Sequence, residues 1–191
     1  GIISVRIGLF FFMGLLLWYS AARLPRFIEL GSACILLVVS LTLMQYHWKV
    51  SRQIDSDIRE LCSVEKYLAP NRTLLPLNYS GNWFHLHFSN YLGIKKPLVI
   101  FENYEASTGY FPLKWTDKGP GNLGDAFRHP PCADIERYEK TTGAEVDYVF
   151  RWYFKPENTD SCASALEQVL KKNYTCVFLS ENKKAELFKR M

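Results

Sequence analysis

The chain has 191 residues, 48% of them hydrophobic, and a net charge of +4 at pH 7. That length fits one ordinary domain with a small appendage. Residues 1–50 carry four basic side chains against one acidic, so most of the positive charge flanks apolar runs, and no basic patch for nucleic acid follows from it.

The first 50 residues contain two apolar runs separated by a short polar turn. Residues 27–46 supply the roughly 20 apolar residues with which a helix crosses the hydrocarbon core of a membrane. Residues 7–22 are slightly short for this purpose, but the run can be extended to Gly1 if Arg6 snorkels or faces a neighbouring helix. Pro25 suits a turn, and neither run has a polar face. We therefore predict two transmembrane helices in 1–50, with a pair of buried core helices in a soluble protein as the alternative.

The basic residues around these runs bear on the orientation. Arg23 and Arg26 favour a cytoplasmic turn, because positive charge is enriched on that side of membranes. Lys49 and Arg52 favour the opposite orientation, and the acidic residues that follow them weigh little. We expect a cytoplasmic turn and an extracytoplasmic C-terminal part. The chain begins at Gly1 without a signal-peptide pattern, so we also expect it to be the C-terminal piece of a longer protein.

Residues 51–70 predict an amphipathic connector helix. Ile54, Ile58 and Leu61 recur at helical spacing with charged residues between them. We expect this helix to pack on the domain that follows, with an interfacial membrane helix as the alternative.

Residues 71–191 predict a small three-layer α/β domain. The expected strands lie in 73–82, 96–103, 145–154 and, as a hairpin around the turn 180–184, in 174–190. The expected helices cover 82–94, 132–143 and 160–173, and the stretch 104–131 reads as a long irregular excursion. Strands separated by helices imply a mainly parallel sheet with helices on its faces.

A resemblance to a known kind of protein covers most of the chain. Its segments read LLPLNYSGNWFHLHFSNYLGIKKPLVIFENYEASTGYFPLKW, IERYEKTTGAEVDYVFRW and NYTCVFLSENKKAELFKR. In layout and closing strand pattern the chain resembles the end of bacterial polytopic membrane proteins of the glycosyltransferase type. The resemblance implies the last transmembrane helices of such a protein, at the bacterial inner membrane, followed by an extracytoplasmic α/β domain. Those enzymes use a lipid-linked sugar donor and carry their catalytic acids in an early loop, so no catalytic residue transfers to this chain.

Motifs that would indicate a cofactor or metal are missing from the sequence. There is no P-loop, dinucleotide fingerprint, Gly-x-Ser-x-Gly or HExxH pattern, and we predict no cofactor. His85 and His87 would share one face of a strand, but they point apart on the predicted helix, so we predict no metal site.

The cysteines of residues 51–191 fall into two kinds. Cys62 and Cys176 read as core residues. Cys132 and Cys162 each stand at the start of a predicted helix and could meet at one end of the sheet. An oxidising compartment would allow a disulfide between them, and we expect one bridge or none.

The best candidate site follows from topology, because ligands of open parallel sheets bind beyond the carboxyl ends of the strands. The first two predicted strands end in NYSGNW and ENYEAS. Their polar side chains suit a sugar or another polyol and are Asn78, Ser80, Asn82, His85, Glu102, Asn103 and Glu105, accompanied by Tyr79, Trp83 and Tyr104. The alternative is that the polar residues form turns while the aromatic residues fill the junction with the membrane. If the edge serves a substrate, Glu102 and Glu105 should be partly exposed.

The leading hypothesis is a membrane-anchored accessory domain of a glycosyltransferase-like integral membrane protein that helps to position a glycan or lipid-linked substrate. Its expected partners are the lipid bilayer, a glycan or lipid-linked sugar, and the rest of the parent protein. The alternative is a non-catalytic, membrane-tethered domain that binds a protein partner. A self-contained enzyme is disfavoured, because no nucleophile with a matching base is legible in the sequence.

Overall fold

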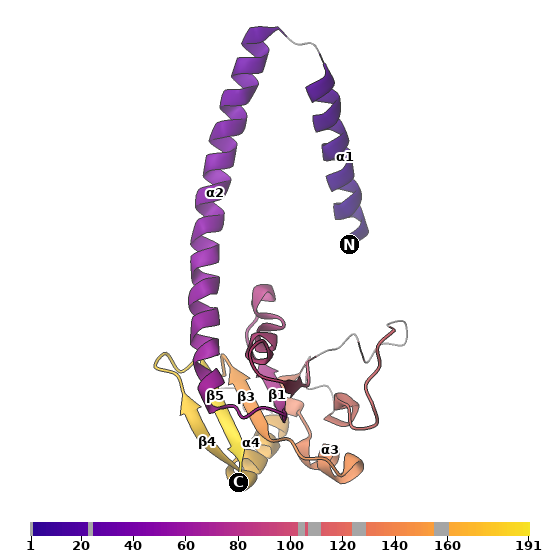
Figure 1. Cartoon of the computed structure of the whole chain (residues 1–191), viewed down its shortest axis with the longest axis vertical. Helices are drawn as coiled ribbons and strands as arrows, with labels where there is room; N and C mark the ends of the chain where they lie inside the picture. Colours follow the sequence, from indigo (N-terminus) through magenta and orange to yellow (C-terminus); the bar gives the residue numbers. More distant parts are fainter. Residues whose placement is uncertain (1, 23–24, 103–105, 107–111, 124–128, 155–160) are drawn as a thin grey trace. The chain divides into compact units, whose positions relative to one another are not determined.

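The structure is a computed structural model that describes residues 2–22, 25–102, 106, 112–123, 129–154 and 161–191 (Figure 1). The chain divides into two compact units, Gly1–Ser51 and Arg52–Met191. The helix α2 (Arg26–Cys62) begins in the first unit and contributes its last turns to the second.

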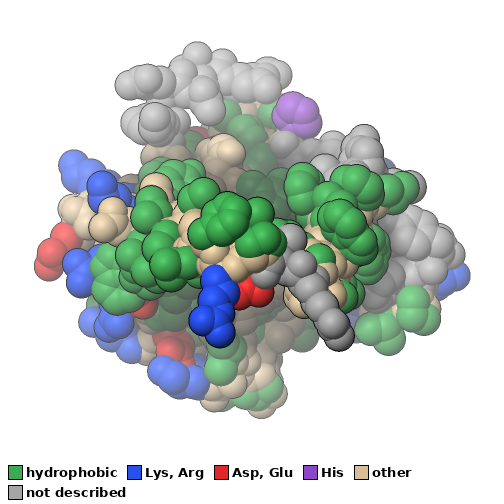
Figure 2. Space-filling view, turned by 90° about the horizontal axis from the view of Figure 1, so that it is seen from above, with side chains coloured by type: hydrophobic (Ala, Val, Ile, Leu, Met, Phe, Trp, Pro, Cys, Tyr) green, Lys and Arg blue, Asp and Glu red, His purple; other side chains and the backbone are tan. Residues whose placement is uncertain are grey.

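The first unit contains α1 (Ile2–Ala21) and the apolar part of α2. The Tyr19 hydroxyl donates a 2.6 Å hydrogen bond to Ser32 Oγ and links the two helices. Large hydrophobic side chains of both helices are exposed, and hydrophobic side chains gather on the face seen from above in Figure 2. Exposed apolar side chains in such number are typical of a surface that contacts lipid or protein.

Among the described residues, one helix is long and apolar enough to cross a membrane. It covers Arg26–Tyr67 and reaches a mean hydropathy of 2.2 in a window of which none is buried. The shorter apolar helix Phe10–Ala21 does not reach that length. Membrane association is compatible with these helices, and the predicted transmembrane hairpin stays a prediction.

The second unit is built on a five-stranded sheet in the order β2–β1–β3–β5–β4 (Figure 1). The strands are β1 (Arg72–Asn78), β2 (Leu98–Ile100), β3 (Tyr148–Trp152), β4 (Tyr174–Leu179) and β5 (Ala185–Arg190). β1 pairs in parallel with β2 and β3, whereas β5 pairs antiparallel with β3 and β4. The sheet is therefore mixed, with its parallel part around β1, and the expectation of a mainly parallel sheet was too strong. The C-terminal hairpin is present as predicted, and it places β5 beside β3 and β4 at the edge.

Both faces of the sheet are covered. Leu75, Leu77 and Val149 pack in one apolar cluster with residues of α3 (Ile135–Thr142) and α4 (Ser161–Asn173). Side chains of the opposite face form a second cluster, which contains Leu61, Val64, Leu68, Leu74, Phe88, Leu92, Tyr148, Phe150, Trp152, Ala185 and Leu187. Burial on both faces explains why the sequences of β1 and β3 are almost continuously apolar.

The predicted connector 51–70 forms the end of α2 and the 3₁₀ helix η1 (Ser63–Tyr67). Leu61, Val64 and Leu68 are buried in the second cluster. The prediction that this segment packs on the following domain is therefore confirmed.

β2 ends next to a proline of its neighbour β1. Leu74 points its carbonyl towards β2 and accepts a 2.9 Å hydrogen bond from the Phe101 N–H. Two residues on, Pro76 points to the same side and has no N–H to donate. Because β2 already ends at Ile100, the absent N–H of Pro76 leaves no gap in the hydrogen bonds between β1 and β2.

The helix predicted over 82–94 is wrong in its detail. The segment forms two 3₁₀ helices, η2 (Trp83–His85) and η3 (Phe88–Gly93), separated by His87 in the left-handed region at φ 66°. Asn, Trp, Phe, His and Ser are weak helix formers, so local preference does not resist the break. The break places His85 in a polar network and Phe88 in the second cluster.

The helices α3 and α4 confirm their predictions. Asp134 caps α3 by accepting a 2.9 Å hydrogen bond from the Arg137 N–H, and Gly143 ends it at φ 62°. Glycine adopts that left-handed conformation without steric cost, which is why it marked the end in the sequence.

Candidate functional site

The structure brings together most of the predicted edge residues that it describes. Asn78 ends β1, Ser80 and Asn82 lie on the loop after it, and His85 lies on η2. Glu102 follows β2. Asn103 and Glu105 lie outside the described residues, as does Tyr104.

Asn78 and Asn82 shape the loop through their side chains. The Asn78 side-chain amide donates to the His85 carbonyl oxygen at 2.9 Å, and its Oδ1 accepts from the Ser80 N–H at 2.9 Å. Asn82 Oδ1 accepts from the Phe84 N–H at 3.0 Å and thereby caps η2. Much of this polar sequence therefore does form turns, as the alternative interpretation expected.

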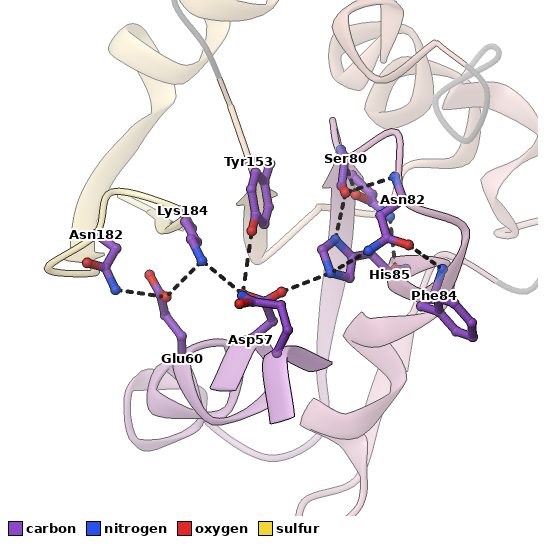
Figure 3. A network of polar contacts seen from close by, with 11 residues as sticks. Asp57, Glu60, Ser80, Asn82, Phe84, His85, Tyr153, Asn182 and Lys184 are labelled. Carbon is purple, nitrogen blue, oxygen red and sulfur yellow. Dashed lines mark hydrogen bonds and ion pairs between the residues drawn. The ribbon is translucent and has the colours of Figure 1, made fainter. Parts of the chain in front are cut away.

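The His85 ring lies at the centre of a buried polar network (Figure 3). Ser80 Oγ is 2.6 Å from Nδ1, and Asp57 Oδ2 is 3.1 Å from Nε2. One neutral tautomer satisfies both contacts, because Nε2–H donates to Asp57 while Nδ1 accepts from the Ser80 hydroxyl. The ring is only 3% exposed, and aromatic rings of Phe88 and Tyr153 lie 4.7 and 5.3 Å from it, centroid to centroid.

Asp57 is 1% exposed and is kept ionised by its partners. Lys184 Nζ donates to Asp57 Oδ1 at 2.9 Å, and Gln53 Nε2 lies 3.3 Å from the same oxygen. Burial raises the pKa of the Asp57 carboxyl, but the hydrogen bonds from Lys184 and Gln53 and the charge of Lys184 outweigh it, so the pKa lies below its ordinary value. The hydrogen bond to Asp57 in turn raises the pKa of the Lys184 amine.

The same network reaches the turn between β4 and β5. Glu60, one turn after Asp57 on α2, accepts from the Ser180 hydroxyl at 2.7 Å and from the Asn182 side-chain amide at 3.2 Å (Figure 3). Lys184 Nζ lies 3.9 Å from Glu60 Oε2. The end of α2 is thus joined by polar contacts to the β4–β5 turn as well as to the loop after β1.

Glu102 does not lie as expected. It is 5% exposed, and its Oε1 accepts a 2.9 Å hydrogen bond from the His87 N–H. Burial, only partly opposed by that bond, raises the pKa of Glu102 from 4.5 to about 7. The expectation of a partly exposed carboxylate is therefore wrong for Glu102, whose side chain lies inside the domain against the His87 backbone.

A small cavity of about 10 Å³ lies beside Glu102 and is lined also by His85, Ser89 and Trp152. Three buried atoms at this cavity have no hydrogen-bond partner among the described residues: Glu102 Oε2, Ser89 Oγ and Trp152 Nε1. A space of this size with several polar groups around it is suited to a single water molecule.

The tip of the loop is the exposed part of the edge. Trp83 is 79% exposed, and Gly81, Asn82 and Phe84 are also exposed. Ser80 is half-buried between this tip and His85. The site therefore has a solvent-facing aromatic and amide surface next to a buried, hydrogen-bonded network.

A second hollow, of about 380 Å³, lies between α3 and α4. Cys132, the last residue of the 3₁₀ helix η6 (Pro130–Cys132), and Cys162, in the first turn of α4, form a disulfide there with their Cα atoms 4.7 Å apart. The predicted pairing is thus present. Cys62 packs against the second cluster, whereas Cys176 is exposed on β4, so the prediction of a core position is wrong for Cys176.

Sequence reasoning missed Asp57, Lys184 and Tyr153 as members of the network. The usable signal was Asp57 itself, which lies one turn before the buried Leu61 on the apolar stripe of the connector. An acidic residue on such a stripe needs a buried partner. That partner lies far away in sequence and could not be named from spacing.

The described residues contain no group of three His, Cys, Asp or Glu side chains that could hold a metal ion. No family model matches the chain, and neither a curated protein nor a solved structure matches it. The resemblance to glycosyltransferase-type membrane proteins stays a prediction, and function has to be argued from the site.

Proposed function

We propose that the chain is a membrane-anchored domain of a glycosyltransferase-like integral membrane protein, and that the loop after β1 helps to position a glycan or the sugar of a lipid-linked substrate. The observation that carries the proposal is Trp83, 79% exposed beside Asn82 at the carboxyl end of a parallel strand.

The chemistry of the loop tip suits a polyol. A tryptophan ring presents a large apolar face, against which the C–H face of a sugar packs. The neighbouring Asn82 side-chain amide supplies an N–H donor and the Ser80 oxygen an acceptor for sugar hydroxyls. Sites for small polar ligands combine such aromatic area with a few placed polar groups.

The buried network supports this use of the tip. Asn78, Asn82 and His85 hold the loop through side-chain hydrogen bonds, and Asp57 anchors His85. A loop whose shape is set before binding loses less entropy when the ligand arrives.

Tethering by α2 favours a substrate that itself stays at the membrane. A ligand attached to a lipid and a domain attached to the same membrane meet at a raised effective concentration. Weak contacts at a small exposed tip then suffice for positioning.

The experiment is a glycan array probed with the full chain in lipid nanodiscs. We expect binding to a subset of saccharides and a loss of about tenfold in affinity for Trp83→Ala, which removes the stacking face. Trp48→Ala, at an exposed tryptophan of α2, is the matched control and should bind like the wild type. Binding that Trp83→Ala leaves unchanged contradicts the proposal.

The second candidate function is a membrane-tethered domain that binds a protein. The exposed pair Trp83 and Phe84 is the observation that favours it, because aromatic side chains are enriched at protein interfaces. Under this candidate no saccharide binds, and Trp83→Ala weakens a protein complex instead.

A further inference from the structure

We propose that Ser80, His85 and Asp57 form a nucleophile–base–carboxylate relay that cleaves a carboxylic ester, with Ser80 Oγ as the attacking atom. This activity goes beyond the positioning of a glycan and does not depend on it. The contacts that suggest it come from α2, the loop after β1 and η2, and no sequence motif announces them.

The three side chains stand in the order that acyl transfer requires. The Ser80 hydroxyl donates to His85 Nδ1 across 2.6 Å, and His85 Nε2–H donates to Asp57 Oδ2 across 3.1 Å. Such relays are recognised by geometry and roles, and either ring nitrogen can act as the base when the carboxylate holds the other. Asp57 fixes the tautomer in which Nδ1 is free to take the serine proton.

Asp57 and His85 are held in place by neighbours that take no part in the reaction. Lys184 pairs with Asp57 at 2.9 Å, and the Tyr153 hydroxyl lies 3.4 Å from Asp57 Oδ1. Phe88 and Tyr153 flank the imidazole. Asp57 and His85 are thus buried, whereas Ser80, at the other end of the relay, is half-buried.

The surroundings of Ser80 supply donors for developing negative charge. The Asn82 N–H donates to Ser80 Oγ at 3.1 Å, which stabilises charge on that oxygen. The N–H of Gly81 donates to no residue that the structure describes, and Gly81 is exposed with open space on its Cα. The N–H of the residue after a nucleophile is a common oxyanion donor, and Gly81 stands in that position.

The reaction balances with water as the second reactant. Ser80 Oγ bonds to the acyl carbon while its proton passes to His85 Nδ1. The bond from that carbon to the leaving alcohol then breaks as His85 returns the proton to the alcohol oxygen. Water attacks the acyl-serine by the same route, His85 taking and returning a proton, and an acid and an alcohol are released.

The test is labelling of the full chain in detergent with a biotinylated fluorophosphonate, which forms a covalent adduct with activated serines. Mass spectrometry of the wild type should locate the adduct on Ser80. Ser80→Ala should reduce labelling to under a tenth, whereas Ser89→Ala, at a buried serine without a hydrogen-bond partner among the described residues, should leave it unchanged.

Two further variants separate the relay from a purely structural network. Asp57→Asn should slow labelling by about 100-fold or more, because the wrong tautomer of His85 is then favoured. His85→Gln keeps hydrogen-bonding capacity but has no base, and it should abolish labelling. The melting temperature and the disulfide of each variant report its folding. Wild-type protein without an adduct on Ser80, or folded variants labelled at the wild-type rate, would overturn the proposal; where a variant does not fold, the wild-type adduct map decides.

Discussion

Glu102 shows at the scale of one residue how burial opposes charge. Its pKa is raised from 4.5 to about 7 by burial. Between those pH values the folded chain keeps a proton that the unfolded chain releases, so stability falls as the pH rises through this window. Above pH 7 Glu102 is ionised in the folded chain as well, and the free energy of unfolding is then lower by the full amount, roughly 3 kcal/mol at 1.36 kcal/mol per pKa unit.

Glu102→Gln should therefore stabilise the protein at pH 8 by up to roughly 3 kcal/mol and change little at pH 4. The Gln carbonyl can still accept from the His87 N–H, so the fold is kept. Denaturant unfolding of the full chain in detergent at both pH values measures the difference. Glu136→Gln, at an exposed carboxylate, is the control and should shift neither curve by more than about 0.5 kcal/mol. Destabilisation by Glu102→Gln at pH 8 would contradict this account.

Lys184 compensates the buried negative charge of Asp57. Lys184→Met removes the ammonium 2.9 Å from Asp57 Oδ1 and leaves an uncompensated carboxylate inside the protein. We expect a loss of roughly 3 kcal/mol or more in unfolding free energy at pH 7. Lys183→Met, at the exposed neighbouring position, should cost under about 0.5 kcal/mol in the same unfolding assay. Equal stability of the two variants would show that Lys184 does not support Asp57.

The disulfide joins the end of η6, which precedes α3, to the first turn of α4. Cys132 and Cys162 are 30 residues apart in sequence. Closing a loop of that length lowers the entropy of the unfolded chain and stabilises the fold by roughly 3–4 kcal/mol. Cys132→Ser combined with Cys162→Ser should lose about that much, measured by denaturant unfolding against the oxidised wild type.

Thiol counting on protein alkylated during isolation from cells checks the bridge itself. Three of the five cysteines, Cys34, Cys62 and Cys176, should react in denaturant without reductant, and all five after reduction. Such a bridge also fits the expected extracytoplasmic side, because disulfides persist in oxidising compartments. Five reactive thiols before reduction would contradict both points.

The elements that the sequence predicted well are those whose signals are local. Gly143 marks the end of α3, and apolar runs in the sequence predict β1 and β3. The break at His87 was not legible, because it depends on where His85 and Phe88 find partners in three dimensions. The order of the strands in the sheet could not be predicted from the sequence either, because the pairing of β5 with β3 depends on tertiary packing.

The candidate site was predictable in position but not in exposure. The rule for the carboxyl ends of parallel strands brought Asn78, Ser80 and His85 to one edge, where the structure also has them. The rule does not say how deeply each side chain is buried. Glu102 was therefore expected to be partly exposed, and Asp57 was not considered. Depth depends on contacts across the chain, here with α2 and the β4–β5 turn.

The whole molecule combines a helix able to cross a membrane with an α/β domain that carries an exposed aromatic loop. The proposed role follows from that combination, because a tethered domain samples ligands that share its membrane. We propose that a saccharide binds at the loop tip, and the alternative is that a protein binds there.

Photo-crosslinking in the native cells distinguishes a saccharide from a protein at the loop tip. A p-benzoylphenylalanine in place of Phe84 puts a reactive aromatic group at the exposed tip. The same group in place of Leu179, exposed on the edge strand β4, is the control. We predict a saccharide-containing adduct at position 84, identified by mass spectrometry, and none at position 179. Adducts at position 84 that contain only protein, or no adduct there above the control, would contradict the account.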